Sequence, residues 1–233
     1  MDKVYPGVDE AVADIRNGAS IAIAGFFTAG TPYRLIEALA RQGARDLTII
    51  CQQMGPGNGE ILQLVARGQV RKAVCNYPFY RSLSRGARCV FEQAVRAGEI
   101  EMEVYPMGTF IEKLRAGGAG LGAFYTPTGV GTVVARGKER RSFNGREYLL
   151  ELALKPDFAL VHAFKGDRMG NLVCRKTARN YAPEMAASAH TTIASVEQLA
   201  EPGELDPDMV HVPGIYVQRV VKVDRINYVP TIE

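Results

Sequence analysis

Short apolar runs alternate with amphipathic stretches along most of the chain. Residues 21–23, 47–50 and 158–163 are almost entirely apolar, without the polar alternation of a strand that has one wet face. Such runs predict strands buried on both faces of a sheet. Residues 70–75, 101–105 and 191–196 predict further strands.

Between the first two runs, apolar residues recur at helical spacing. Leu35, Ile36, Leu39 and Ala40 form one stripe, and Gly43 follows it, which predicts an amphipathic helix with a glycine end. A strand, a helix and a strand in this order make a βαβ unit with a right-handed crossover. We therefore expect an α/β fold, with an open, mostly parallel sheet flanked by helices. Further helices are expected at 9–15, 61–66, 91–97, 110–116 (capped by Thr109) and 183–189.

The middle of the chain does not show this alternation of strand and helix patterns. Residues 117–132 are dense in glycine, and the interleaved Phe124 and Tyr125 favour a packed loop with a closely approached backbone. Residues 133–154 are typical of a small antiparallel insertion, with Asn144-Gly145 as its hairpin turn. Since no repeat or domain-sized linker interrupts the chain, we expect one domain over residues 1–233.

Composition and charge exclude several classes of function. The chain is 47% apolar and 23% charged, and its net charge of +3 is spread along it, which gives no support for a nucleic-acid partner. No stretch resembles a signal peptide or a membrane span. The basic cluster at 138–141 is expected to be a solvated loop, with a phosphate contact as the alternative. The four cysteines (Cys51, Cys75, Cys89 and Cys174) lack C-x-x-C spacing, so we expect buried free thiols and a cytoplasmic location.

The stretch at residues 17–32 combines a strand, a loop and a helix start. An Asn-Gly turn leads into the 21–23 run, and the loop that follows contains Gly25 and Gly30. Thr31 can cap the next helix, and Pro32 suits its first turn. This geometry presents backbone N–H groups and a positive dipole end to an anion. A plain strand–helix corner and a ligand-binding loop fit the pattern equally well.

A self-contained catalytic or metal site is not evident. His162, His190 and His211 have no metal-ligand spacing and are expected to be structural. Ser82, Ser84 and Ser188 lie in no nucleophile elbow. Glu60 is the only acid in a glycine-rich loop, and a helix N-terminal role suits it best. The residues alone therefore assign no catalytic group and no metal ligand.

Four segments resemble the small (alpha, or A) subunit of family I coenzyme A transferases of the 3-oxoacid type. The first is N-G, three apolar residues, then A-G-F-x-x-x-G-x-P at 17–32, where Ala24 replaces the usual first glycine. A methyl group there is tolerated only if the backbone φ is negative. The others are R-A-G-G-A-G with A-F-Y-T-P-T-G-V-G-T, the K-G-D-R-M-G-N turn and R-K-T-A-R-N, within residues 115–132, 165–171 and 175–180. The resemblance covers nearly the whole chain.

This resemblance implies a heteromer that is active only together with a partner, the beta subunit, with α2β2 stoichiometry expected. In this family a beta-subunit glutamate attacks an acyl-CoA such as succinyl-CoA, and CoA passes through a glutamyl-CoA thioester to a carboxylate such as acetoacetate or 3-oxoadipate. CoA is thus a substrate, and no permanently bound cofactor is expected. The resemblance assigns coenzyme A contacts to Ala24, Gly25, Phe26, Phe27, Thr28, Ala29 and Gly30.

Two departures from the family pattern fall in the expected substrate pocket. Gln52-Gln53 stand where relatives commonly have two asparagines, and Met107 stands where they have glutamine. Methionine cannot replace the glutamine's hydrogen bond, so we expect either a changed acyl preference or silent drift. Phe124 is assigned to the same pocket. The aromatic residues Tyr77, Phe79, Tyr80 and Phe110 are expected to make that pocket more apolar.

Two other functions fit the same fold class. A sugar-phosphate isomerase requires acids and lysines that converge in this chain, and the sequence shows no clear set. A non-catalytic sensor requires tight small-molecule binding without a partner or turnover.

Overall fold

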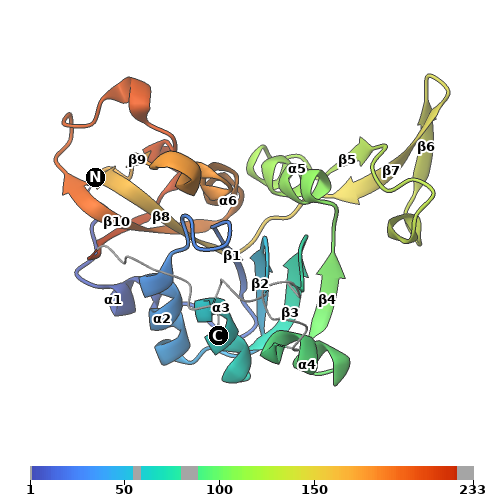
Figure 1. Cartoon of the computed structure of the whole chain (residues 1–233). Helices are drawn as coiled ribbons and strands as arrows, with labels where there is room; N and C mark the ends of the chain where they lie inside the picture. Colours follow the sequence, from blue (N-terminus) through green and yellow to red (C-terminus); the bar gives the residue numbers. More distant parts are fainter. Residues whose placement is uncertain (1, 55–58, 80–88, 225–233) are drawn as a thin grey trace.

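One mostly parallel sheet forms the centre of the molecule (Figure 1). Within residues 2–54, 59–79 and 89–224, which the computed structural model describes, eight strands join it in the order β11-β10-β8-β1-β2-β3-β4, with β9 beside β8. Every pair along this order is parallel, and β9 alone is antiparallel. The strands are β1 (Ser20–Ile23), β2 (Leu47–Cys51), β3 (Val70–Cys75), β4 (Glu101–Val104), β8 (Phe158–Asp167), β9 (Leu172–Val173), β10 (Thr191–Ala200) and β11 (Arg219–Lys222). The predicted fold class is confirmed.

The strand order reverses between β1 and β8. From β1 the chain moves outward through β2, β3 and β4, and the later strands β8, β10 and β11 add to the other side of β1. In open parallel sheets, ligands bind at the carboxyl ends of the strands where the order reverses. The segment that follows β1 therefore lies where this fold class places a site.

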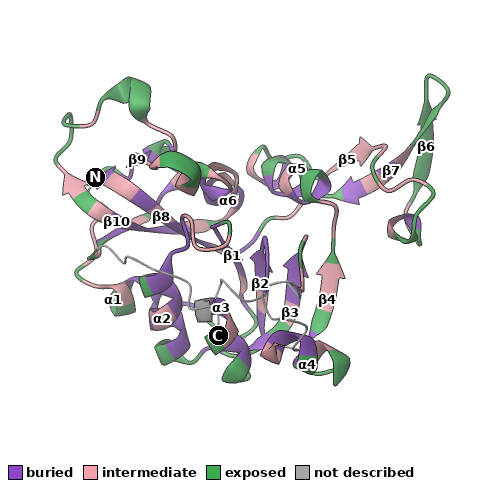
Figure 2. Cartoon of the chain, viewed as in Figure 1, coloured by how far each residue is buried: buried purple, intermediate pink, exposed green. Residues whose placement is uncertain are grey.

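Helices cover both faces of the sheet (Figure 2). On one face, α1 (Val8–Val12), α2 (Tyr33–Gln42), α3 (Gly59–Ala66) and α4 (Val90–Arg96) bury apolar residues against Ile21, Ile23 and Ile49. On the other, α5 (Met107–Gly118) and α6 (Ala182–Ser188) pack against Ala22 and Ile50. Successive strand residues point to opposite faces, so fully apolar strands supply both cores.

A three-stranded antiparallel sheet projects away from this body (Figure 1). It consists of β5 (Ala123–Thr126), β6 (Arg140–Phe143) and β7 (Arg146–Leu152), in the order β5-β7-β6. Asn144 (φ 49°) and Gly145 (φ 76°) make the predicted hairpin turn between β6 and β7. We call residues 123–152 the arm. The remaining short turns are η1 (Val133–Ala135), η2 (Lys176–Arg179), η3 (Pro207–Met209) and η4 (Gly214–Tyr216).

Two expectations for the start of the arm region are wrong. Helix α5 begins at Met107 with Pro106 at its N-cap, so Thr109 lies inside the first turn and does not cap it. The helix then continues through Gly117 and Gly118, which the sequence suggested were loop. A Cβ at Gly117 would lie 2.0 Å from the carbonyl oxygen of Leu154, so glycine lets the chain returning from the arm pass the helix.

Most other elements match their predictions, with differences at the ends. Helix α1 ends at Val12 rather than residue 15, and strands β8 and β10 run on to Asp167 and Ala200. Strand β5 lies in the stretch that was expected to be a loop, and β6 begins inside the basic cluster at 138–141, so both loop predictions are wrong there. The short strands β9 and β11 were not predicted. Residues 55–58 of the glycine-rich loop, together with Tyr80, Ser82 and Ser84, lie outside the described residues. No helix in the described part is long and apolar enough to cross a bilayer.

Candidate functional site

The loop at residues 24–30 begins where β1 ends, beside β8. The backbone N–H of Ala24 donates to the carbonyl oxygen of Leu160 (3.0 Å), which continues the pairing of the two strands by one residue. Ala24 is buried and does not have a positive φ, so the methyl group that replaces the family's glycine is tolerated. The next residue, Gly25, has φ +124°, and a Cβ there would lie 2.4 Å from the Thr31 hydroxyl oxygen.

Thr31 closes this loop instead of capping the helix that follows. Its hydroxyl donates to the carbonyl oxygen of Phe27 (2.8 Å). Helix α2 begins at Tyr33, with Pro32 at the N-cap and no side-chain cap, so the predicted roles of Thr31 and Pro32 are each wrong by one position. The hydroxyl therefore helps to fix the loop, in which Phe27 has the positive φ of 51°.

A second segment, residues 175–181, packs against the loop although it lies far from it in the sequence. The Asn180 amide donates to the carbonyl oxygen of Ala29 (2.8 Å). A Cβ at Gly30 would lie 2.6 Å from the carbonyl oxygen of Ala178, so the two backbones touch. Residues 24–30 and 175–181, which the sequence singled out separately, thus form one unit.

A pocket of about 250 Å³ opens between this unit and strands β8 and β10. Of the segment expected to contact coenzyme A, Thr28, Ala29 and Gly30 line it. Arg34, Arg175 and Lys176 place three basic side chains around it, with Glu197 and Asp224 as the acids. The excess of basic groups and the start of α2 favour an anionic ligand.

An ionisable cluster lies at the wall of this pocket. His162 Nδ1 is 2.9 Å from the Ser195 hydroxyl oxygen, and its Nε2 is 3.6 Å from the Glu197 carboxylate. Burial lowers the pKa of His162, the nearby Arg175 charge lowers it further, and Glu197 opposes both effects. The lowered pKa favours the neutral ring near pH 7. Arg175 lies 3.6 Å from Glu197 and stacks 4.3 Å above the centre of the Phe164 ring.

The sequence did not reveal this cluster. His162 was expected to be structural, and Ser195 and Glu197 were not singled out. These residues meet only because β8 and β10 pair with His162 opposite Ser195. A polar residue inside an otherwise apolar strand, as at His162, was the one available signal.

Neutral polar groups gather at the carboxyl ends of β2 and β3. Gln52 and Gln53 follow β2 and are buried, and Asn76 follows β3. Gln52 Oε1, Asn76 Oδ1 and Thr109 Oγ1 are buried and have no hydrogen-bond partner within the part of the chain that the structure describes. Buried polar atoms are nearly always satisfied, so each of these three has hydrogen-bonding capacity that the described part of the chain does not use.

The other expected pocket residues lie apart from one another. Met107 is 49% exposed at the start of α5, and Phe124 is half-buried on β5 in the arm. Phe110 is fully buried in the core, so its expected place in a pocket wall is wrong. Phe79 packs on Phe91 with ring centres 5.9 Å apart, and Tyr77 is 44% exposed. The side chain of Glu60 lies outside the described residues.

His211 and the four cysteines have structural surroundings. His211 Nδ1 accepts from the backbone N–H of Cys174 (3.0 Å). All four thiols are free as predicted, and only Cys89 is less than fully buried. Among the described residues, no three His, Cys, Asp or Glu side chains are grouped to hold a metal ion.

Comparisons with known proteins identify relatives of the whole chain and of its fold. The chain is 49% identical to the A subunit of the 3-oxoadipate CoA-transferase of Pseudomonas putida, over 96% of this chain and 94% of that protein. It is 42% identical to the A subunit of the succinyl-CoA:3-ketoacid coenzyme A transferase of Helicobacter pylori strain J99, over 97% and 95%. The crystal structure of glutaconate coenzyme A-transferase from Acidaminococcus fermentans has the same fold, with a TM-score of 0.85 at 22% identity over 95% of this chain and 76% of that one. The family model for coenzyme A transferase matches residues 6–223, and the chain belongs to this family.

Proposed function

We propose that the chain is the alpha subunit of a 3-oxoacid CoA-transferase, which moves CoA from succinyl-CoA to a 3-oxoacid such as 3-oxoadipate or acetoacetate. The observation that carries this proposal is the likeness to the Pseudomonas putida protein, 49% identical along nearly all of both chains. The position of the 24–30 loop at the β1–β8 reversal supports it, since that is where a parallel sheet of this kind binds a ligand.

The reaction needs a nucleophile, which we assign to a glutamate of the beta subunit. Its carboxylate attacks the thioester carbonyl of succinyl-CoA, forming a mixed anhydride and releasing the CoA thiolate. The thiolate then attacks the glutamyl carbonyl of the anhydride, which releases succinate and leaves a glutamyl-CoA thioester. The 3-oxoacid carboxylate repeats these steps in reverse order, so the acyl acceptor leaves as its CoA ester and the glutamate is regenerated.

This chain then contributes binding and polarity rather than the nucleophile. The 24–30 loop contacts coenzyme A, and Arg34, Arg175 and Lys176 supply positive charge for an anionic group of a substrate. Gln52 and Gln53, at the carboxyl end of β2, face the reacting acyl group as neutral hydrogen-bonding side chains, and Met107 borders the acyl group from the start of α5, whereas Phe124 lies apart from them in the arm. Neutral donors suit this position because negative charge develops on the acyl oxygen in the transition state.

Mass spectrometry of the trapped intermediate tests the assignment. The chain is co-expressed with its partner, exposed to succinyl-CoA and reduced with borohydride, which converts a thioester-bound glutamate to an alcohol. We expect the reduced residue on the partner only and no turnover by this chain alone. A modified residue on this chain, or CoA transfer without a partner, would contradict the proposal.

A further inference from the structure

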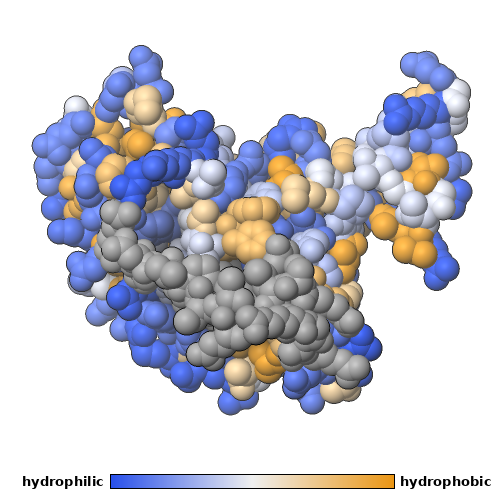
Figure 3. Space-filling view, viewed as in Figure 1, coloured by the Kyte–Doolittle hydropathy of each residue, from blue (hydrophilic) through white to orange (hydrophobic). Residues whose placement is uncertain are grey.

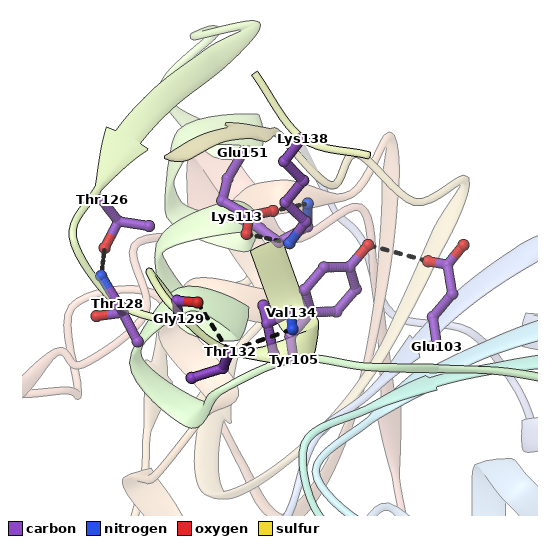
Figure 4. A network of polar contacts seen from close by, with 10 residues as sticks. All are labelled: Glu103, Tyr105, Lys113, Thr126, Thr128, Gly129, Thr132, Val134, Lys138 and Glu151. Carbon is purple, nitrogen blue, oxygen red and sulfur yellow. Dashed lines mark hydrogen bonds and ion pairs between the residues drawn. The ribbon is translucent and has the colours of Figure 1, made fainter. Parts of the chain in front are cut away.

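The arm is attached to the body through a buried network of charges (Figure 4). Glu151 on β7 is 2% exposed and accepts from Lys113 of α5 (3.2 Å) and from Lys138. Lys113 also lies 4.3 Å from the centre of the Tyr105 ring, whose hydroxyl donates to Glu103 (3.1 Å). If the arm moved away from the body, the buried Glu151 carboxylate would lose its Lys113 partner. The network therefore fixes the direction in which the arm projects.

The two faces of the arm's sheet have different environments. Leu149 is fully buried, and it and Glu151 point toward the body, where the 127–138 loop and α5 cover them. Strand alternation and the β5–β7 and β6–β7 registers place a second set of side chains together on the opposite side. We call this set the aromatic face, and it consists of Tyr125, Phe143, Tyr148, Leu152, Arg141 and Arg146.

The aromatic face is ordered but uncovered. Phe143 lies between Tyr125 and Tyr148, with ring centres 5.3 Å apart in each case and edge-to-face geometry. Phe143 is 40% exposed and Leu152 is 65% exposed. In Figure 3 hydrophobic residues of the arm appear among strongly hydrophilic ones. Packed rings that remain accessible lose little side-chain entropy when a partner covers them.

The charges of this face are positive and largely unpaired. Residues 123–152 carry five basic and three acidic side chains; Glu147 and Glu151 are engaged by Arg140 and Lys138, and Glu139 accepts a hydrogen bond from the Tyr125 hydroxyl. Within the described chain, Arg141 and Arg146 make no ion pair and instead lie 5.5–5.9 Å from the aromatic rings. Exposed tyrosine, phenylalanine and arginine are the residue types that dominate protein–protein binding energy.

We propose that the aromatic face is a docking surface for the beta subunit, through an apolar patch on that partner bordered by carboxylates. A second copy of this chain fits poorly, because a two-fold contact would bring the same guanidinium groups opposite one another. A partner with carboxylates would satisfy Arg141 and Arg146 and bury Phe143 and Leu152. This assignment rests on the proposed function, since it requires a heteromer.

Binding measurements with arm variants test the assignment. The full chain is titrated with the purified partner, the beta subunit, in low and high salt. We expect Arg141→Glu/Arg146→Glu and Phe143→Ser each to weaken binding by about tenfold or more, as for residues central to an interface. Higher salt should weaken wild-type binding and have less effect on the double charge variant. The matched control is Arg45→Glu/Arg67→Glu, which makes the same charge change at two exposed residues that precede β2 and β3, and should bind normally.

The outcomes separate this assignment from the proposed function. If wild-type and arm variants bind the beta subunit equally while the enzyme turns over, the docking surface is wrong and the function stands. If the wild-type chain alone forms dimers in sedimentation experiments and the arm variants do not, the occupant is a second copy, which overturns the assignment. If the wild-type chain does not bind the purified partner, the heteromer and this assignment are both wrong.

Discussion

The contact between the 24–30 loop and the 175–181 segment predicts a measurable cost for one methyl group. In Gly30→Ala, the backbone φ of +77° disfavours alanine by about 1 kcal/mol. The new Cβ would also lie 2.6 Å from the carbonyl oxygen of Ala178, where ordinary contacts begin at 3.4 Å. Backbone is not free to rotate away, so overpacking adds about 1–3 kcal/mol. The total expected loss of unfolding free energy is about 2–4 kcal/mol.

Gly98→Ala is the matched control for this variant. Gly98 has nearly the same backbone angle, φ +76°, and no atom lies within 4 Å of a Cβ placed there. This variant should therefore lose only the conformational part, about 1 kcal/mol. For a chain of this size the expected decreases in Tm are about 2–4 °C for Gly98→Ala and about 4–16 °C for Gly30→Ala. Thermal unfolding at fixed protein concentration measures both. Equal decreases would refute the contact between the two segments.

Three further predictions concern the substrate pocket, the arm and His162. Met107→Gln restores a hydrogen-bonding side chain and should raise kcat/KM for 3-oxoacids about 2–10-fold relative to other carboxylates, and an unchanged preference across an acceptor panel would contradict it. Lys113→Met should lower the free energy of unfolding in urea by about 3 kcal/mol because Glu151 loses one of two buried partners, whereas Lys113→Met/Glu151→Leu should lose less. Burial lowers the pKa of His162 from its ordinary 6.5, so the unfolded chain takes up the proton first and stability should fall as pH decreases below about 6.5. In His162→Gln the free energy of unfolding should fall less steeply over this pH range. If the stability-versus-pH curves of the two proteins are parallel, His162 does not cause the loss.

The first half of the sheet could be predicted from the sequence because its signals are local. Strands β1, β2 and β3 are short strand-forming runs, and the helices between them end at glycine. Strands that are consecutive in the sequence are also adjacent in the sheet. The hairpin of the arm was equally clear, since Asn144-Gly145 specifies its turn. By contrast β9 spans only two residues and has no strand signal of its own, whereas β11 contains the β-branched pair Val220-Val221, a strand signal that the prediction did not use.

The candidate site depends on contacts that no local pattern contains. The 24–30 loop was identified from its motif, but its packing against Ala178 and Asn180 requires the fold. His162 and Glu197 approach each other because two strands far apart in sequence pair in one register. The Lys113–Glu151 pair is hidden for the same reason, since each residue alone resembles a solvated charge on a helix or strand.

The central position of β1 has a consequence during synthesis of the chain. Strands β1 to β4 and their helices can assemble as soon as the first half has left the ribosome, because their pairings are sequential. The other edge of β1 pairs only with β8, which begins at Phe158. Until then a nascent chain presents an apolar strand with free backbone N–H and C=O groups, the feature that promotes edge-to-edge aggregation. That unpaired edge therefore persists while the ribosome translates the arm.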